Sequence, residues 1–254
     1  MSDATSSPGL SEKLAQFVAA PHAGAAFDDA LRAARTYLLD ARRSLQTPSA
    51  TSELASRALA SYGAPLRRTF TAAVVLSGAS GDRTNAAIVA AAVSSSELVG
   101  RGETDVVEAI AIGREVALRL DRALTFDAPW DAAGVIAGIG AAAAAARAAG
   151  LDAGSARNAI GLAATQATGL GVAEGTPAAA LATGKAAADA VEAALLARNG
   201  FTAASAALEG RRGLAALMAS RFDATLLSDD LGSRWARRSA SSLTILVDNA
   251  SPAG

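Results

Sequence analysis

The sequence predicts an all-α protein, and three observations carry this prediction. Alanine, the residue with the highest helix propensity, dominates the apolar residues. Apolar segments with helical spacing begin after Ser, Thr or Asp and end at Gly or before Pro, as helices commonly do. Only residues 242–248, SLTILVD, have the composition of a strand. Because one short strand cannot form a sheet, we expect a single helical domain.

The first part of the chain predicts four helices. The clearest covers 28–46, whose apolar side chains recur at a spacing close to 3.6, namely Leu31, Ala34, Leu38, Ala41 and Leu45. Pro48 ends this helix, and Gly63 separates the two that follow. Residues 78–85, GASGDRTN, have the composition of a loop. The expected helices are 11–20, 28–46, 51–62 and 65–77.

The second part of the chain predicts longer helices with recognisable ends. Asp131 and Asp152 precede alanine-rich segments as N-caps, and Thr176 followed by Pro177 starts another helix. Glu115 and Arg119 have the i, i+4 spacing of an ion pair on a solvated face. The expected helices are 85–99, 105–125, 132–150, 152–168 and 177–199, with shorter pieces at 208–220 and 226–235. Gly134 and Gly138 indicate close helix packing within 132–150.

The predicted domain covers residues 11–238, between a disordered leader at 1–10 and a residual tail at 239–254. The leader lacks the basic and apolar regions of a signal peptide. The longest uncharged runs, 132–146 and 158–173, are shorter than the roughly 20 residues that cross a membrane. We therefore expect a soluble, cytoplasmic protein with no membrane partner.

Composition excludes several functions. The net charge is −1, and no basic face with interleaved aromatic residues indicates nucleic-acid binding. The chain has no Cys and one His, which leaves no ordinary set of metal ligands and no thiol nucleophile. No glycine-rich turn joins a strand to a helix, so no nucleotide fingerprint is present. We expect neither a metal nor a cofactor.

Residues 86–235 resemble the MmgE/PrpD family, which includes 2-methylcitrate dehydratase and cis-aconitate decarboxylase. The motifs are GRGETDVVEAIAIGREVALRL near the start and Gly-Leu-Asp at 150–152. They continue with Gly-Lys-Ala-Ala at 184–187, Gly-Phe at 200–201, Leu-Glu-Gly at 208–210 and Leu-Gly-Ser-Arg-Trp at 231–235. The resemblance implies the helical domain of that family and a homodimer, and we expect the family's second, α/β domain to be lacking here.

The resemblance also implies His and Lys residues that move protons, and these are replaced in this chain. Arg83 and Asp131 stand at two of the histidine positions, and Ala179 and Ala182 stand where a Lys and a His are expected. Arginine keeps its proton near neutral pH, and alanine cannot carry one. We therefore do not expect the ordinary dehydratase reaction.

The replaced positions nevertheless outline a candidate site. Arg83 suits bidentate binding of a carboxylate, with Asp82, Asn85 and Trp130 as further substrate-binding residues. Asp131 and Lys185 are the candidate catalytic residues, because a carboxylate can accept a proton and a buried lysine can act as a base or form a Schiff base.

Structural interpretations of the same residues stay open at this point. Arg83 could be a solvated loop arginine, Asp131 only an N-cap, and Trp130 a core or interface anchor. Lys185 could form a surface ion pair with Asp189 or Glu192, and Asp82 and Asn85 could serve only the turn.

Two functions follow from these alternatives. In the first, the chain is a repurposed enzyme that binds a small carboxylate and carries out an altered lyase, isomerase or cyclase step. In the second, it is a non-catalytic helical module that dimerises or binds a full-length relative. A polar pocket that joins Arg83 and Asp131 would favour the first.

Overall fold

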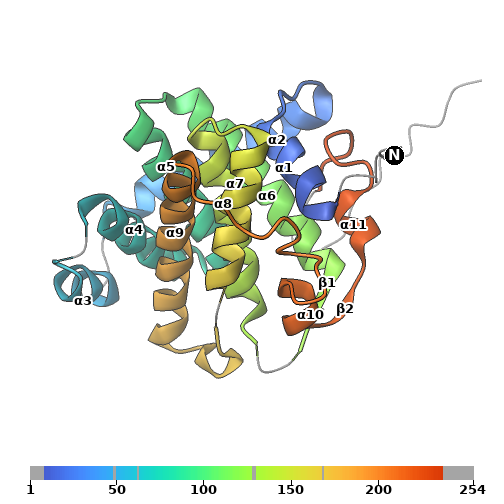
Figure 1. Cartoon of the computed structure of the whole chain (residues 1–254). Helices are drawn as coiled ribbons and strands as arrows, with labels where there is room; N and C mark the ends of the chain where they lie inside the picture. Colours follow the sequence, from blue (N-terminus) through green and yellow to red (C-terminus); the bar gives the residue numbers. More distant parts are fainter. Residues whose placement is uncertain (1–8, 48–49, 62, 128–129, 168, 237–254) are drawn as a thin grey trace, which may run out of the picture.

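The computed structural model describes residues 9–47, 50–61, 63–127, 130–167 and 169–236. This part of the chain is built almost entirely from helices, which confirms the predicted fold class (Figure 1). The larger helices are α1 (Leu10–Ala19), α2 (Ala25–Ser44), α3 (Ala50–Ala58), α4 (Ala64–Ser80), α5 (Arg83–Val99), α6 (Glu103–Ala123), α7 (Ala132–Ala148), α8 (Ala153–Gln166) and α9 (Pro177–Arg198). None of the described helices is both long enough and apolar enough to span a membrane.

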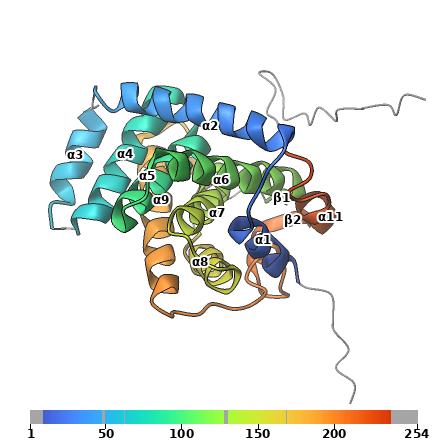
Figure 2. The same ribbon diagram turned by 90° about the horizontal axis from the view of Figure 1, so that it is seen from above.

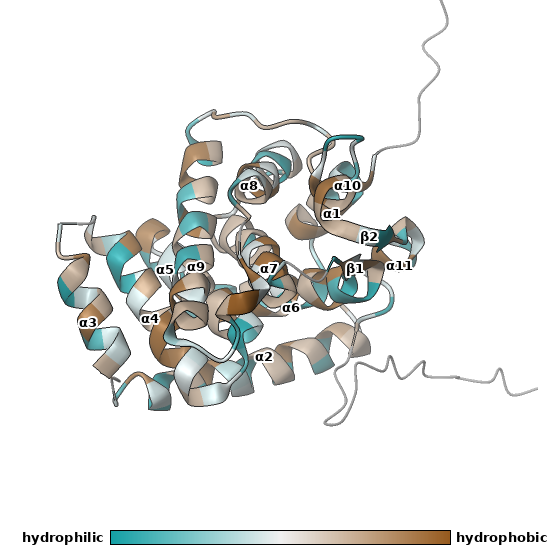
Figure 3. Cartoon of the chain, turned by 90° about the horizontal axis from the view of Figure 1, so that it is seen from below, coloured by the Kyte–Doolittle hydropathy of each residue, from teal (hydrophilic) through white to brown (hydrophobic). Residues whose placement is uncertain are grey.

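Helix α7 forms the centre of the molecule. All its residues from Gly134 to Ala146 are buried, and it packs against α5, α6, α8 and α9. Figure 3 shows α7 enclosed by these helices. Its small side chains let neighbouring backbones approach on every side, which explains why an alanine-rich segment can be a core helix without large apolar residues.

The closest helix contact in this centre joins α6 and α7. A Cβ atom added to Gly113 would lie 2.6 Å from the carbonyl oxygen of Gly140 and 2.7 Å from the Cβ of Ala144. The sequence led us to expect close packing at Gly134 and Gly138. At Gly138 the nearest atom, the Cβ of Ala186, is 3.8 Å away, so that position is not a point of closest approach. Gly134 packs against the side chain of Asp131, the residue that caps the start of α7.

The junction between α4 and α5 is shorter than predicted. Residues 78–85 were expected to form a loop, but α4 continues to Ser80 and α5 begins at Arg83. Gly81 adopts a left-handed conformation with φ 68°, which ends α4, and the Asp82 side chain accepts a hydrogen bond from the Asn85 amide to cap α5. Two residues therefore turn the chain, and Arg83 becomes the first residue of a rigid helix.

Glu115 and Arg119 form the predicted ion pair, but the prediction that this pair lies on a solvated face is wrong. Glu115 is 1% exposed and Arg119 is 5% exposed. Arg119 donates to Glu115 and to the carbonyl oxygens of Leu227, Asp229, Asp230 and Arg234, while Glu115 also accepts from the Ala236 amide. The ion pair thus fixes the last described segment of the chain onto α6.

That last segment is less helical than expected. It contains α10 (Leu214–Met218) and α11 (Ala224–Ser228), and β2 (Ala219–Phe222) pairs antiparallel with β1 (Leu124–Phe126). We did not predict this small sheet. The predicted strand at 242–248, the tail at 239–254 and most of the leader at 1–10 lie outside the described residues.

An aromatic cluster joins the first helix to the end of the described chain. His22 lies between Phe17, Phe27 and Trp235, with ring centroids 4.7 to 5.5 Å from its own. A ring nitrogen of His22 is 2.8 Å from the carbonyl oxygen of Phe17. Burial lowers the pKa of His22 below its ordinary value of 6.5. The histidine is therefore part of the packing, and it lies outside the candidate site.

Candidate functional site

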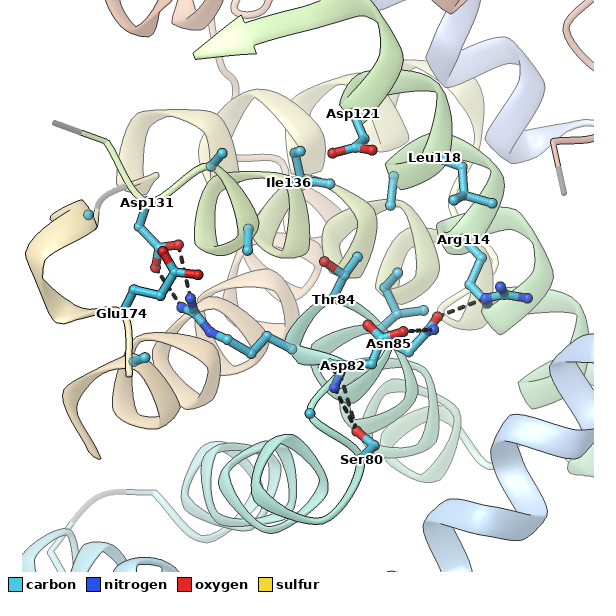
Figure 4. A pocket seen from close by; sticks show the side chains of 18 of the residues that line it. Ser80, Asp82, Thr84, Asn85, Arg114, Leu118, Asp121, Asp131, Ile136 and Glu174 are labelled. Carbon is cyan, nitrogen blue, oxygen red and sulfur yellow. Dashed lines mark hydrogen bonds and ion pairs between the residues drawn. The ribbon is translucent and has the colours of Figure 1, made fainter. Parts of the chain in front are cut away.

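A cavity of about 820 Å³ lies at one end of the helical bundle. Its walls come from the α4–α5 junction, α6, the start of α7 and the loop that precedes α9, including the short 3₁₀ helix η1 (Gly171–Ala173). Figure 4 shows Asp131 and Glu174 at one end of this main cavity and Arg114 and Leu118 at the other. Segments far apart in the sequence thus contribute to one polar site.

An ion pair between Arg83 and Asp131 forms part of the cavity wall. Nη1 of Arg83 donates to Oδ1 of Asp131 at 2.9 Å, and Nη2 donates to Oδ2 at 2.5 Å. The side chains are only 15% and 9% exposed. Nε of Arg83 donates to the Thr183 hydroxyl of α9 at 2.9 Å. These contacts with described residues use three of the five guanidinium N–H groups and leave two.

Asp131 is held in place by its own helix start and by two glycines. Its Oδ1 accepts a hydrogen bond from the Gly134 amide at 3.1 Å, which makes Asp131 the N-cap of α7. A Cβ at Gly134 would lie 2.7 Å from Oδ2, and one at Gly169 would lie 2.7 Å from the Asp131 Cβ. Counted over the described residues, Oδ1 therefore accepts two hydrogen bonds and Oδ2 accepts one. Since each carboxylate oxygen has about two acceptor positions, these contacts leave one position on Oδ2.

A second polar network occupies the other part of the cavity. The side chain of Asn85 donates to Asp82 at 2.6 Å and accepts from Nε of Arg114 at 2.7 Å. Arg114 also donates to the Tyr37 hydroxyl, and its guanidinium lies 4.0 Å from the centre of the Tyr37 ring. This chain of contacts joins α2, α5 and α6 and fixes the orientation of Arg114.

Acidic groups outnumber basic groups in the wall. The main cavity is lined by Arg83 and Arg114 and by four carboxylates, those of Asp82, Asp121, Asp131 and Glu174. Among the described residues, His, Asp and Glu side chains form no group of three or more that could hold a metal ion. A ligand that enters this cavity therefore meets two guanidinium groups within a predominantly acidic surface.

Comparison with known proteins assigns the helical core to a family. A sequence model described as the MmgE/PrpD N-terminal domain matches residues 78–227. The chain belongs to the MmgE/PrpD family. A comparison with curated proteins finds no match.

The matched MmgE/PrpD region contains Arg83 and Asp131, the two residues that we expected to stand at histidine positions of the family. Arg83 and Asp131 are 48 positions apart in the chain, and the structure brings their side chains into direct contact. Asp82, Asn85 and Trp130 line the same cavity, so five of the six candidate site residues are grouped together. Trp130 is half-buried at this wall, and its backbone forms a bridge to Leu170.

Lys185 is the candidate that the structure separates from the others. It lines a different cavity of about 310 Å³, together with Ala182 and Asp189. Its side chain is 53% exposed and forms an ion pair with the nearly buried Asp189. Burial raises the pKa of Asp189, and the contact with Lys185 opposes that rise. The position matches the surface ion-pair interpretation and lacks the burial that a Schiff-base lysine needs.

The sequence analysis did not identify three residues of the site. Arg114 follows Gly113 in a helix whose charges suggested a solvated face, although its charge is directed toward Asn85. Thr183 is buried in an alanine-rich helix, between Ala179 and Lys185. A polar residue among alanines was the feature of the sequence that could have indicated its role. Glu174 lies in a glycine-rich loop, where composition carries no sign of a cavity wall.

Proposed function

We propose that the main cavity binds a small molecule with one carboxylate, and that Arg83 is the group that holds this carboxylate. The observation that supports the proposal is the bidentate Arg83–Asp131 pair in the wall of a polar cavity. Asp131 and Thr183 orient the guanidinium, and the two N–H groups outside these bonds are available to ligand oxygens. A fixed guanidinium loses little conformational entropy when a ligand binds.

Asp131 has a second role in this proposal. The acceptor position that remains on its Oδ2 can take a hydrogen bond from a ligand hydroxyl, or accept a proton from a carbon next to the ligand carboxylate. The reaction that fits these groups is an altered lyase, isomerase or cyclase step that begins with proton removal. The resemblance implies His and Lys as the acid and base of a family dehydratase, and the described residues that line this cavity include neither type.

The acidic lining restricts the ligand further. One carboxylate can pair with Arg83. The other guanidinium of the wall, that of Arg114, already contacts Asn85 and Tyr37, so an additional carboxylate of the ligand would lie mainly among Asp82, Asp121 and Glu174. Like charges placed opposite one another weaken binding. We therefore infer that the ligand is a hydroxy or oxo monocarboxylate, and that tricarboxylates such as 2-methylcitrate or cis-aconitate bind poorly and are not converted.

Calorimetric titration tests this proposal. The full chain is titrated with hydroxy monocarboxylates, dicarboxylates and citrate, and the same ligands are added to the double variant Arg83→Met/Asp131→Asn. The asparagine keeps an oxygen that can cap α7, and no charge is left unpaired. We expect monocarboxylates to bind the natural chain about 10- to 100-fold more tightly than the variant, because a charge-assisted contact is lost. Equal affinities, or preference for citrate, would reject the proposal.

A non-catalytic role is the second candidate, and exposed apolar side chains favour it. Leu170 is 63% exposed and Val172 is 85% exposed in the loop before α9. Adjoining exposed apolar side chains that form a patch are typical of surfaces that bind other proteins. In this alternative a second copy, or a relative from the family, packs on the loop. Light scattering tests it: a dimer that Leu170→Ser/Val172→Ser converts to a monomer supports the module, and a monomeric natural chain argues against homodimerisation.

A further inference from the structure

The main cavity is larger than a carboxylate and a neighbouring hydroxyl group require. Its volume of about 820 Å³ lies in the upper part of the range of sites that enclose drug-sized molecules. Arg83 and Asp131 lie at one end of it, the end at which Figure 4 also shows Glu174. The character of the remaining wall therefore decides what the rest of the ligand can be.

The wall next to Asp131 is apolar. Ala132 and Ala133 follow Asp131 in the first turn of α7, and Ile136 lies one turn further on. All three line the cavity, and the two alanines are half-buried, so they keep part of their surface accessible. Apolar surface thus begins directly beside the Arg83–Asp131 pair.

Helix α6 continues this apolar surface. α6 and α7 lie side by side in the core (Figure 2). One face of α6, with the i, i+3, i+4, i+7 spacing, lines the cavity through Arg114, Ala117, Leu118 and Asp121. The charged residues are the first and last of this face, and the half-buried Leu118 lies between them. Figure 4 shows Ile136 between Asp131 and Leu118, so the apolar side chains of the two helices follow one another across the cavity.

The polar groups of the cavity leave room for an apolar chain. The side chains of Asp82 and Asn85 bond to one another, and Asn85 also accepts a hydrogen bond from Arg114. Asp121 and Glu174 are exposed, so water can still reach them when a ligand is bound. A chain that covers the apolar side chains therefore removes apolar area from water while these polar contacts stay in place.

From these observations we propose that the ligand of the main cavity carries an aliphatic chain. The inference rests on the function proposed above, in which Arg83 holds the carboxylate. From Asp131 the chain follows the first turn of α7 and ends against Leu118 of α6. The substrate class is then a medium-chain aliphatic hydroxy or oxo monocarboxylate, and a short acid fills only the Arg83 end of the cavity.

A homologous series of ligands tests the aliphatic chain. The acids 2-hydroxybutanoate, 2-hydroxyhexanoate and 2-hydroxyoctanoate share one head group and differ in chain length. In calorimetric titrations of the full chain we expect the affinity to rise about two- to fourfold for each methylene group that leaves water. The eight-carbon acid should then bind roughly 20- to 200-fold more tightly than the four-carbon acid. The double variant Arg83→Met/Asp131→Asn should weaken the binding of all three acids by a similar factor.

A matched pair of variants locates the chain. Ala132 and Ala153 each follow an aspartate N-cap and are half-buried, but Ala153 does not line the main cavity. Ala132→Leu fills space beside Asp131, so it should lower the preference for the eight-carbon over the four-carbon acid by at least about fivefold. Ala153→Leu should leave this preference unchanged.

The outcomes separate the aliphatic chain from the carboxylate site on which it depends. Equal affinities along the series, weakened together in the Arg83→Met/Asp131→Asn variant, would overturn the chain and leave the carboxylate site. A preference for long acids that Ala132→Leu does not lower, or that Ala153→Leu lowers equally, would place the chain outside this wall and overturn the inference as well. Binding of no acid of the series, or equal binding to the double variant, would reject both proposals.

Discussion

Arg83 is the first residue of α5, Asp131 caps α7, and their side chains meet through two parallel hydrogen bonds of 2.9 and 2.5 Å. The pair thus connects the starts of two core helices as well as lining the main cavity. Both residues therefore contribute to folding and, in our proposal, to ligand binding. Experiments on them must separate these two contributions.

A double-mutant cycle makes that separation. Arg83→Met leaves the Asp131 carboxylate buried without its partner, and Asp131→Asn leaves the guanidinium in the same condition. Each single change should lower the free energy of unfolding by up to about 3–5 kcal/mol, whereas the double variant should lose less than the more damaging single change. Urea unfolding of the four proteins measures this. Additive losses would show that the pair is not energetically coupled.

Packing at the α6–α7 contact gives a second prediction. Gly113→Ala places a methyl group 2.6 Å from the Gly140 carbonyl oxygen, so we expect a loss of about 1–3 kcal/mol in unfolding free energy. Gly138→Ala is the control in α7, because its new methyl group meets the Cβ of Ala186 at an ordinary 3.8 Å. Higher helix propensity should make the control neutral or slightly stabilising. Equal thermal shifts in the two variants would contradict this packing.

Substitution of the buried Arg119 should cause one of the largest losses of stability in the chain. Arg119→Met removes the partner of Glu115 and the donors to four carbonyl oxygens, and the expected cost is about 3–5 kcal/mol. Arg43→Met removes an exposed pair with Asp40 and should change stability by less than about 1 kcal/mol. Urea unfolding compares the two, and limited proteolysis should cut near residues 229–236 sooner in the Arg119 variant. Equal losses of unfolding free energy and equal rates of cleavage in the two variants would contradict a stabilising role of the buried Arg119.

His22 predicts a pH dependence of stability. Burial lowers the pKa of His22, so the unfolded chain binds the proton more readily than the folded chain does. Stability should therefore fall as the pH drops below 6.5 toward the lower pKa of the folded state. His22→Phe keeps an aromatic ring in the cluster and removes the titration. Since the chain has one His, the difference between the two proteins from pH 7.5 to pH 5 isolates this effect. If the stabilities of the two proteins change equally with pH, the lowered pKa of His22 does not contribute to folding in this way.

Helix order and several helix starts were predictable from local sequence. Asp131 and Asp152 precede apolar segments as caps, and capping depends on neighbours within three residues. The contact between Arg83 and Asp131 was accessible only through the family resemblance, because periodicity does not say which helix ends meet. The α4–α5 junction was misjudged because Gly, Ser, Asp and Asn indicate a loop even where two residues complete the turn.

Burial of charged residues was the main failure of sequence reasoning. The i, i+4 spacing of Glu115 and Arg119 is the same on a surface and in a core. What buries this pair is a segment more than 100 positions later, whose carbonyl oxygens Arg119 binds. For Lys185 the sequence left a buried base and a surface ion pair open, and the side chain proves to be half-exposed and paired with Asp189. Such tertiary contacts are not encoded in a local pattern.

The most direct test of the central proposal is a crystal structure with the hydroxy monocarboxylate that binds most tightly in the titrations. We predict the ligand in the main cavity, with a carboxylate oxygen about 2.7–3.2 Å from a terminal nitrogen of Arg83 and a ligand hydroxyl or acidic carbon facing Oδ2 of Asp131. A ligand bound elsewhere at full occupancy, with the main cavity holding only solvent beside an undisturbed Arg83–Asp131 pair, would contradict the proposal.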